Sequence, residues 1–390
     1  MSRFTFALMV AIAIILNACG TPDAIHLSST RIVPDETFLP TSTKEPERVV
    51  FVNIHAPSLT QNLLAESDER TLIVYLPPSY ATSQARYPVV YYLPGFGDLS
   101  MLGVNLPMGI DKEIGNGTVK EMIVVIASGV NALGGSFYVN SPVTGNWDDF
   151  ITRDVVSYVD ANYRTIRNPD SRGISGHAMG GYGALNLAML HPDVFGAVYS
   201  ISPDLFDPNG LAESQIFSTQ RLIDDFVDFQ TRQSLAPVDK AVSAMKDATG
   251  DLQFALAYGA AFAPAPLTSP HFGVQGGPPY IAYPYQRQNG RLFRDDSVWK
   301  RWEAGFGAIP DKIQTYKENL LKLNSIVIDY GANDQYRWLP RGCEYFSAQL
   351  TAAGIPNQLV SFPRDHRSGL EQRIRGYMLP FFSQKLVFDN

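Results

Sequence analysis

The chain has 390 residues, of which 45% are hydrophobic and 18% charged, and its net charge is −7. These values fit a globular protein with a sizeable core, built as one large domain with an insertion or as two small domains. The acidic balance and the lack of a basic run argue against nucleic acid as a partner. With only Cys19 and Cys343, and Cys19 close to the N-terminus, an internal disulfide framework is excluded.

The N-terminus predicts a signal peptide. Arg3 precedes an apolar run over residues 4–16, which is shorter than the roughly 20 residues that span a bilayer. The following Leu16-Asn17-Ala18-Cys19-Gly20 resembles a bacterial lipobox, although Asn17 departs from the usual small or apolar residue. We expect residues 1–19 to be a lipoprotein-type signal peptide, lipidation at Cys19, and a membrane-anchored location in the bacterial cell envelope. Ordinary cleavage and secretion is the alternative.

Residues 20–48 are rich in Thr, Ser, Pro and Glu and show no helical or strand period. This composition is typical of a flexible tether. The folded domain is expected over residues 49–388.

Apolar runs in this domain alternate with helical patterns. Strands are predicted over residues 49–54, 71–76, 89–93, 122–127, 172–175, 196–201, 325–330 and 358–362, with a polar turn at 68–70 and a helix over 150–163. This alternation favours an α/β fold with a doubly wound, mostly parallel sheet.

The strand–helix alternation stops over residues 204–322. Helices are predicted at 220–232 and 237–248, followed by aromatic, proline-rich stretches at 262–266 and 276–285. We expect a cap or lid over the carboxyl ends of the strands, where ligands bind in such sheets. A packed surface excursion is the alternative. Trp299 and Trp302, at helical spacing, are expected to pack the cap.

One turn has the pattern of a nucleophile elbow. Residues 173–184 read GISGHAMGGYGA, which follows a predicted strand and opens a predicted helix. The pattern is G-x-S-x-G except at its centre, where Ala178 replaces the nucleophilic serine. No second G-x-S-x-G occurs in the chain, and Ser136, Ser175, Ser200 and Ser202 lack the motif.

Together the motifs resemble the esterase D, enterochelin-esterase-like and mycolyltransferase group of α/β-hydrolases. The matching segments are residues 75–78, 86–95, 176–185, 331–334 and 365–366, and the resemblance covers about residues 48–385. It implies an α/β-hydrolase fold and carboxylic ester hydrolysis or acyl transfer. It also implies a small-molecule ester or acylated carbohydrate as ligand. No cofactor and no metal are expected, because the histidines are scattered and the sequence has no phosphate-binding glycine loop.

The order nucleophile, acid, base predicts the partners of the elbow. His366 follows the last predicted strand and is the expected base. Asp334, in the loop after the preceding strand, can reach the imidazole and fix its tautomer. Asp329 competes for this role, but it is still within the predicted strand.

Two backbone N–H groups should form an oxyanion hole. Met179 directly follows the elbow position at a helix N-terminus. By resemblance, the second N–H is that of Phe96, and Gly95, Asn146 and Trp147 border the substrate pocket. For the segment around Asn146, helix capping is the alternative.

A methyl group cannot attack an ester, so the chain as written is expected to be inactive or strongly impaired. Three interpretations of Ala178 stay open. The natural protein could carry a serine there, although the retained leader argues against an engineered variant. The protein could be a pseudoenzyme that binds an ester, an acylated sugar or a protein partner. The remaining His and Asp could also activate water slowly.

Overall fold

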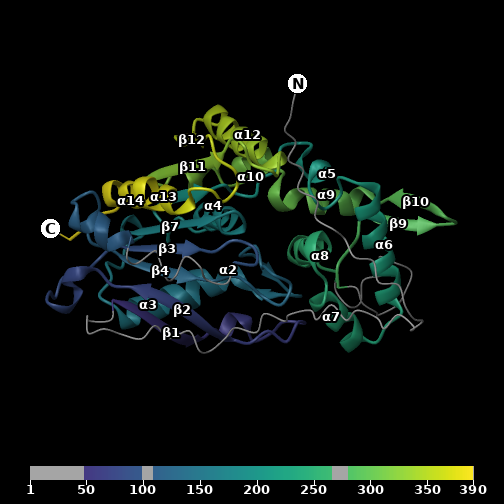
Figure 1. Ribbon diagram of the computed structural model, residues 1–390, viewed down its shortest axis with the longest axis horizontal. Helices are drawn as coiled ribbons and strands as arrows, with labels where there is room; N and C mark the ends of the chain where they lie inside the picture. The colour runs from purple at the N-terminus through teal and green to yellow at the C-terminus, as the bar shows by residue number, and fades with distance from the viewer. Residues whose placement is uncertain (1–47, 99–108, 266–279, 390) are drawn as a thin grey trace, which may run out of the picture. The chain divides into compact units, whose positions relative to one another are not determined.

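An eight-stranded sheet organises the computed structural model, which describes residues 48–98, 109–265 and 280–389. The strand order is β1-β2-β4-β3-β7-β8-β11-β12, and Figure 1 shows it from β12 at the top to β1 at the bottom. The bounds are β1 Val49–His55, β2 Glu69–Tyr75, β3 Val89–Leu93, β4 Ile123–Ala127, β7 Arg172–His177, β8 Ala197–Ile201, β11 Ser325–Gly331 and β12 Gln358–Phe362. β2 is antiparallel to β1 and β4, whereas every pairing from β4 to β12 is parallel. The mostly parallel sheet is therefore confirmed.

Helices and short hairpins fill the connections. The helices are α2 Trp147–Asp149, α3 Val156–Asn162, α4 Met179–Leu190, α5 Gly210–Glu213, α6 Gln220–Ser234, α7 Val238–Lys246, α8 Gly250–Phe262, α9 Asp296–Phe306, α10 Ile309–Thr315, α11 Lys317–Leu320, α12 Trp338–Ala352, α13 Leu370–Arg373 and α14 Leu379–Lys385. The π-helical turns are η3 Phe150–Val155 and η5 Ile374–Met378, and the 3₁₀ turns are η1 Pro57–Leu59, η2 Pro78–Ala81 and η4 Pro169–Ser171. The hairpins pair β5 Asn140–Ser141 with β6 Gly145–Asn146 and β9 Tyr285–Gln288 with β10 Arg291–Arg294.

The central strands are apolar on both faces because each face carries its own core. On β3, Tyr91 and Leu93 join a cluster with α3, α4 and α12. Val90 and Tyr92 join a second cluster with η5 and α14. All five residues of β3 are buried, as a continuous apolar run predicts for a strand covered on both sides.

Two local expectations differ from the structure. Residues 69 and 70 belong to β2 and not to a turn, because Glu69 pairs with His55 and Arg70 with Ile54 across the antiparallel ladder. The connection is the longer segment 56–68. The helix expected over 150–163 begins as the π-helical η3 and continues as α3.

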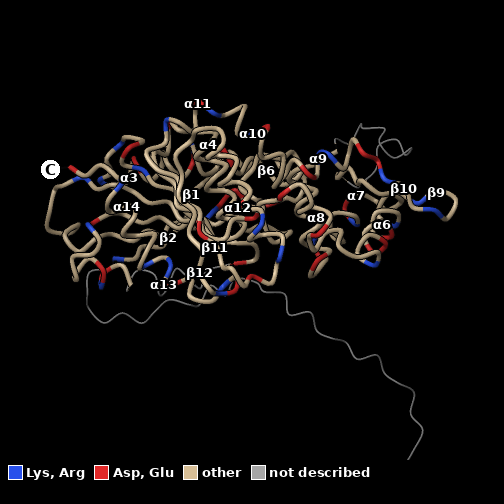
Figure 2. Tube along the Cα trace, turned by 90° about the horizontal axis from the view of Figure 1, so that it is seen from above, with Lys and Arg blue, Asp and Glu red and all other residues tan. Residues whose placement is uncertain are grey.

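The segment between β8 and β11, for which a cap was predicted and which we call the cap, contains α6 to α9 and the β9–β10 hairpin beside the sheet in Figure 1. Figure 2 shows both acidic and basic residues along α6 and this hairpin. Arg287 of β9 forms an ion pair with Asp224 of α6. Trp302 is fully buried against Phe226 and Tyr283 and donates its indole N–H to the Ala282 carbonyl at 2.7 Å. This contact gives Trp302 the expected packing role.

Some expectations concern residues outside the described part of the chain. The signal peptide, Cys19, the tether up to residue 47 and residues 266–279 of the cap all lie there. Among the described residues, no helix combines the length and the apolar character needed to cross a bilayer.

Candidate active site

Ala178 forms the elbow between β7 and α4, at the carboxyl edge of the sheet. Its φ and ψ angles are 52° and −116°, a sparsely populated conformation for a residue with a side chain. Two flanking glycines make the elbow possible: a Cβ atom on Gly180 would lie 1.8 Å from the Leu93 carbonyl oxygen, and one on Gly176 would lie 2.4 Å from the backbone of Gly180. The backbone therefore keeps the strained turn that presents a nucleophile, while the side chain is a methyl group.

His366 and Asp334 form a buried pair. Nδ1 of His366 lies 2.7 Å from Oδ2 of Asp334, and the two side chains are 8% and 0% exposed. Because a carboxylate only accepts hydrogen bonds, Nδ1–H is the donor, and Nε2 is the nitrogen left for a reacting group. The predicted partner is thus in contact with the imidazole.

The competing carboxylate, Asp329, has a different role. It forms a buried ion pair with Arg373 and accepts a 2.9 Å hydrogen bond from the Tyr199 hydroxyl. Asp329 is therefore bound to Arg373 and Tyr199, whereas Asp334 contacts Nδ1 of His366.

Two rings fix the orientation of His366. His177 holds the backbone, because its Nε2 donates to the His366 carbonyl oxygen at 2.9 Å. Burial lowers the pKa of His177 well below its ordinary value, so this ring is neutral. Tyr336 meets the His366 ring edge-on, with centroids 5.4 Å apart.

The loop after β3 lies against the elbow. A Cβ atom on Gly95 would lie 3.7 Å from the Cβ of Ala178, so no side chain separates the two segments. Tyr138 anchors this loop by donating a 2.9 Å hydrogen bond to the Pro94 carbonyl. Within the described residues, the N–H groups of Phe96 and Met179 donate no hydrogen bond, which leaves both available for an oxyanion.

The ring of Phe96 connects this loop to the cap. It packs edge-on against Phe254 of α8, with centroids 5.0 Å apart, and stacks on Phe137 at 6.0 Å. The Phe96 ring therefore joins the loop after β3 to α8 through direct packing.

Asn146 at the end of β6 and Trp147 at the start of α2, both predicted pocket residues, lie in different surroundings. Trp147 is fully buried, donates to the Thr144 carbonyl at 2.7 Å and lies under the guanidinium of Arg70. This environment gives it a packing role and does not support a pocket role. Asn146 is exposed and lines a groove of about 500 Å³ formed by Gln61, Asn62, Leu63, Asn140, Ser141 and Pro142. The side chain of Asn146 does not cap α2; the Asn140 Oδ1 accepts from the first N–H groups of that helix.

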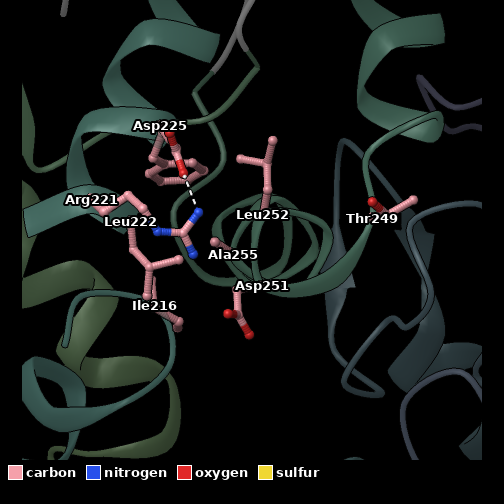
Figure 3. Close-up of a pocket in the computed structure, with 9 residues that line it drawn as sticks. Ile216, Arg221, Leu222, Asp225, Thr249, Asp251, Leu252 and Ala255 are labelled. Carbon is pink, nitrogen blue, oxygen red and sulfur yellow. Dashed lines mark hydrogen bonds and ion pairs between the residues drawn. The ribbon is translucent and has the colours of Figure 1, made fainter. Parts of the chain in front are cut away.

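A second cavity, of about 170 Å³, lies within the cap between α6 and α8. Figure 3 shows Arg221 facing Asp225 across one side, with Asp251 and Leu252 on α8. Burial raises the pKa of Tyr336, the residue that packs on His366, and the charges of Asp204 and Asp251 add to this effect.

Sequence reasoning missed one residue and one cluster. Asp204 lies three residues after the end of β8, at the same carboxyl edge as the elbow, and that position was the available signal. Antiparallel pairing of β1 and β2 also brings His55, Asp68 and Glu69 together, with ligand atoms within 4.8 Å of one another. This group is largely exposed, and exposed acidic groups commonly gather without an ion.

A strained elbow, a buried His–Asp pair and free amides at the carboxyl edge of a parallel sheet define an α/β-hydrolase-type site. Residues 65–304, more than half of the chain, match the family described as "Putative esterase", and the chain belongs to that family.

The relatives match over limited lengths. Esterase Rv1288 of Mycobacterium tuberculosis is 33% identical over 134 residues, which are 33% of this chain and 28% of that protein. The MPT51/MPB51 antigen of the same organism is 37% identical over 76 residues, 19% of this chain and 25% of the antigen. The matches thus cover well under two thirds of either relative.

Solved structures share the fold. A ferulic acid esterase superposes with a TM-score of 0.54 at 20% identity, covering 87% of this chain and 98% of the esterase. An S-formylglutathione hydrolase from Agrobacterium tumefaciens gives 0.51 at 15% identity, covering 89% and 99%. These likenesses confirm the α/β-hydrolase fold.

Proposed function

We propose that this protein binds carboxylic esters at the bacterial cell envelope in an esterase-type site that, as written, hydrolyses them poorly or not at all. One observation carries the proposal: the elbow presents the methyl group of Ala178 beside a complete His366–Asp334 pair. A methyl group has no lone pair to form an acyl-enzyme, so the covalent route is closed.

The rest of the site can still bind and polarise an ester. The free N–H groups of Phe96 and Met179 suit a carbonyl oxygen, and Met179 adds the positive end of α4. His366 could deprotonate a water molecule instead of a hydroxyl. In serine hydrolases that lose a triad member, about 10³–10⁴-fold acceleration over water remains, far below a working esterase.

A non-catalytic binding module is the second candidate, and the same site supports it. The strained φ of Ala178 and the buried His–Asp contact both cost stability, yet the chain has them without the attacking atom. A site that still recognises an ester, an acylated sugar or a protein partner would account for this.

The envelope location rests on the sequence. A leader with an apolar run followed by Cys19 favours a lipid anchor, and residues 20–48 would hold the domain away from the membrane. Labelling of expressing bacteria with an alkyne-tagged fatty acid should mark the full chain and fail to mark Cys19→Ala. Equal labelling of both chains would exclude lipidation at Cys19.

Ester binding without turnover is the decisive test. Calorimetric titration with ethyl butyrate should show saturable binding, and chromatography should recover the ester unchanged. His366→Trp, which replaces the proposed base by a bulkier ring, should abolish binding, while Asn146→Ala should retain it. Rapid conversion to butyrate by the unmodified chain would contradict the proposal.

A further inference from the structure

The loop that follows β8 is held rigidly beside the elbow. The N–H of Asp204 approaches the Ala178 carbonyl oxygen at 3.4 Å, and a Cβ atom on Gly181 would lie 3.1 Å from the Cα of Pro203. On its other side, a Cβ atom on Gly342 would lie 1.8 Å from the Leu205 carbonyl oxygen. Helices α4 and α12 therefore fix the position of Asp204.

The Asp204 residue is mostly buried, but its carboxyl oxygens keep some contact with solvent and, among the described residues, have no protein partner. The residue is 6% exposed, and among the described residues its side chain makes no hydrogen bond or ion pair. Buried polar groups nearly always have a partner, and the exceptions need an explanation. A rigid loop that holds an unpaired carboxyl group costs stability and indicates a ligand that supplies the missing hydrogen bond.

The carboxyl group of Asp204 interacts electrostatically with several groups of the candidate site. Burial is the main cause of the raised pKa of both Asp204 and Tyr336; the charge of His366 lowers and that of Asp334 raises the pKa of Asp204, and the charge of Asp204 adds to the rise at Tyr336. Tyr336 packs on the ring of His366. Asp204 thus belongs to the same space as the imidazole and the elbow, although it takes no part in the His366–Asp334 pair.

We propose that Asp204 is a specificity-determining residue that binds a hydroxyl group of the ester, so that the ligands of this site are esters of polyols or sugars with a free hydroxyl near the ester carbonyl. The inference rests on the ester-binding function proposed above and names the substrate class of that site. A hydroxyl group can both donate to and accept from a carboxyl group, so it pairs with Asp204 in either protonation state.

A cationic ligand fits this site less well. Burial raises the pKa of Asp204 to about 7, so near neutral pH a large fraction of molecules would offer a cation an uncharged group. An apolar ligand would leave the carboxyl group unpaired, with the full desolvation cost.

Three butyrate esters test the proposal. Glycerol monobutyrate offers free hydroxyls, propyl butyrate has nearly the same size without them, and butyrylcholine carries a cation. We expect the unmodified chain to bind glycerol monobutyrate about 10-fold or more tighter than propyl butyrate, because propyl butyrate leaves the carboxyl group without a hydrogen-bond partner. Asp204→Leu should bring this ratio close to one, and Asp204→Asn, which keeps the shape and one acceptor, should give an intermediate ratio.

Asp207→Asn is the matched control, because Asp207 lies in the same loop but pairs with Arg341 at 3.1 Å. It should leave the ratio unchanged. Circular dichroism and the Tm establish that each variant is folded. If the esters bind but the ratio does not depend on Asp204, or if butyrylcholine binds tightest, the role of Asp204 is overturned. If no ester binds to the folded chain, the ester-binding function fails first, and the inference with it.

Discussion

The imidazole of His366 is held by Asp334, whose Oδ2 lies 2.7 Å from Nδ1, and the elbow residue Ala178 carries only a methyl group. The pair fixes the tautomer that leaves Nε2 able to accept a proton. In the proposed site the attacking oxygen is the group that Ala178 lacks, and restoring that oxygen is the most direct test of the site.

Ala178→Ser should convert the chain into an esterase. The serine would occupy a backbone already in the strained elbow conformation, so no rearrangement is needed. We expect initial rates with p-nitrophenyl acetate and butyrate to rise about 10³-fold or more over the unmodified chain. The double variant Ala178→Ser with His366→Ala should fall back to background. An inactive but folded serine variant would indicate a remodelled pocket.

Asp334, after β11, and Asp329, within β11, should have different effects when each is changed to Asn in the Ala178→Ser background: the first on kcat, the second on stability. Asp334→Asn should lower kcat by about 10⁴-fold, because the amide favours the wrong imidazole tautomer, with little change in Tm. Asp329→Asn should instead lower the free energy of unfolding by about 3–5 kcal/mol, because it leaves Arg373 buried without its ion pair. Rate assays and urea titrations of both variants check the contrast, and the reverse pattern would exchange the two roles.

The fold was predictable because the central strands are buried on both faces and read as apolar runs, as in residues 89–93 and 123–127. The edge of the sheet formed by β1 and β2 was harder to predict from the sequence. β1 lies at the sheet edge with alternating exposed residues, so the polar start of β2 at Glu69 suggested a turn.

The site residues were predictable where a sequence motif fixes the geometry. They were less predictable where burial determines the role of a side chain. The elbow and the loops after β11 and β12 follow from strand order and spacing. Trp147 lies in an expected pocket loop, but only the structure shows that its ring points into the core. Asp204 was missed because its burial depends on packing between α4 and α12, helices far apart in the sequence.

Gly180→Ala should destabilise the protein strongly. The added methyl would meet the Leu93 carbonyl oxygen at 1.8 Å, and backbone on both sides of the contact cannot move without shifting β3 from α4. We expect a loss of about 3 kcal/mol or more, measured by urea unfolding. Gly376→Ala is the control, because a Cβ atom there meets nothing within 4 Å, and it should be close to neutral. Equal stabilities would contradict the close packing of the elbow.

Asp204→Asn should stabilise the free protein at alkaline pH. Burial raises the pKa of Asp204 from an ordinary 3.8 to about 7, so the folded state binds its proton more tightly than the unfolded state does. The carboxyl group therefore lowers stability as pH rises from about 4 to 7, and the penalty stays constant above pH 7. The Tm advantage of Asp204→Asn over the unmodified chain should be largest at pH 8 and shrink toward pH 5. Asp207→Asn should show no such trend.

His191 should contribute a pH dependence of its own at the end of α4. Its Nε2 lies 2.8 Å from Oδ1 of Asp148, and this contact raises the pKa of His191 above 6.5, with Asp193 and Asp149 adding to the effect. The imidazolium also faces the negative end of the helix. Because the pKa in the folded state is raised, the stabilisation is complete below about pH 6.5 and is lost as pH rises through the folded pKa.

Between pH 6 and 8.5, the Tm of the unmodified chain should fall by about 1–3 °C more than that of His191→Gln, a small effect because solvent screens the half-exposed ring. Asp148→Asn should remove the same difference, and parallel Tm curves for all three chains would show that the contact is not an ion pair in solution.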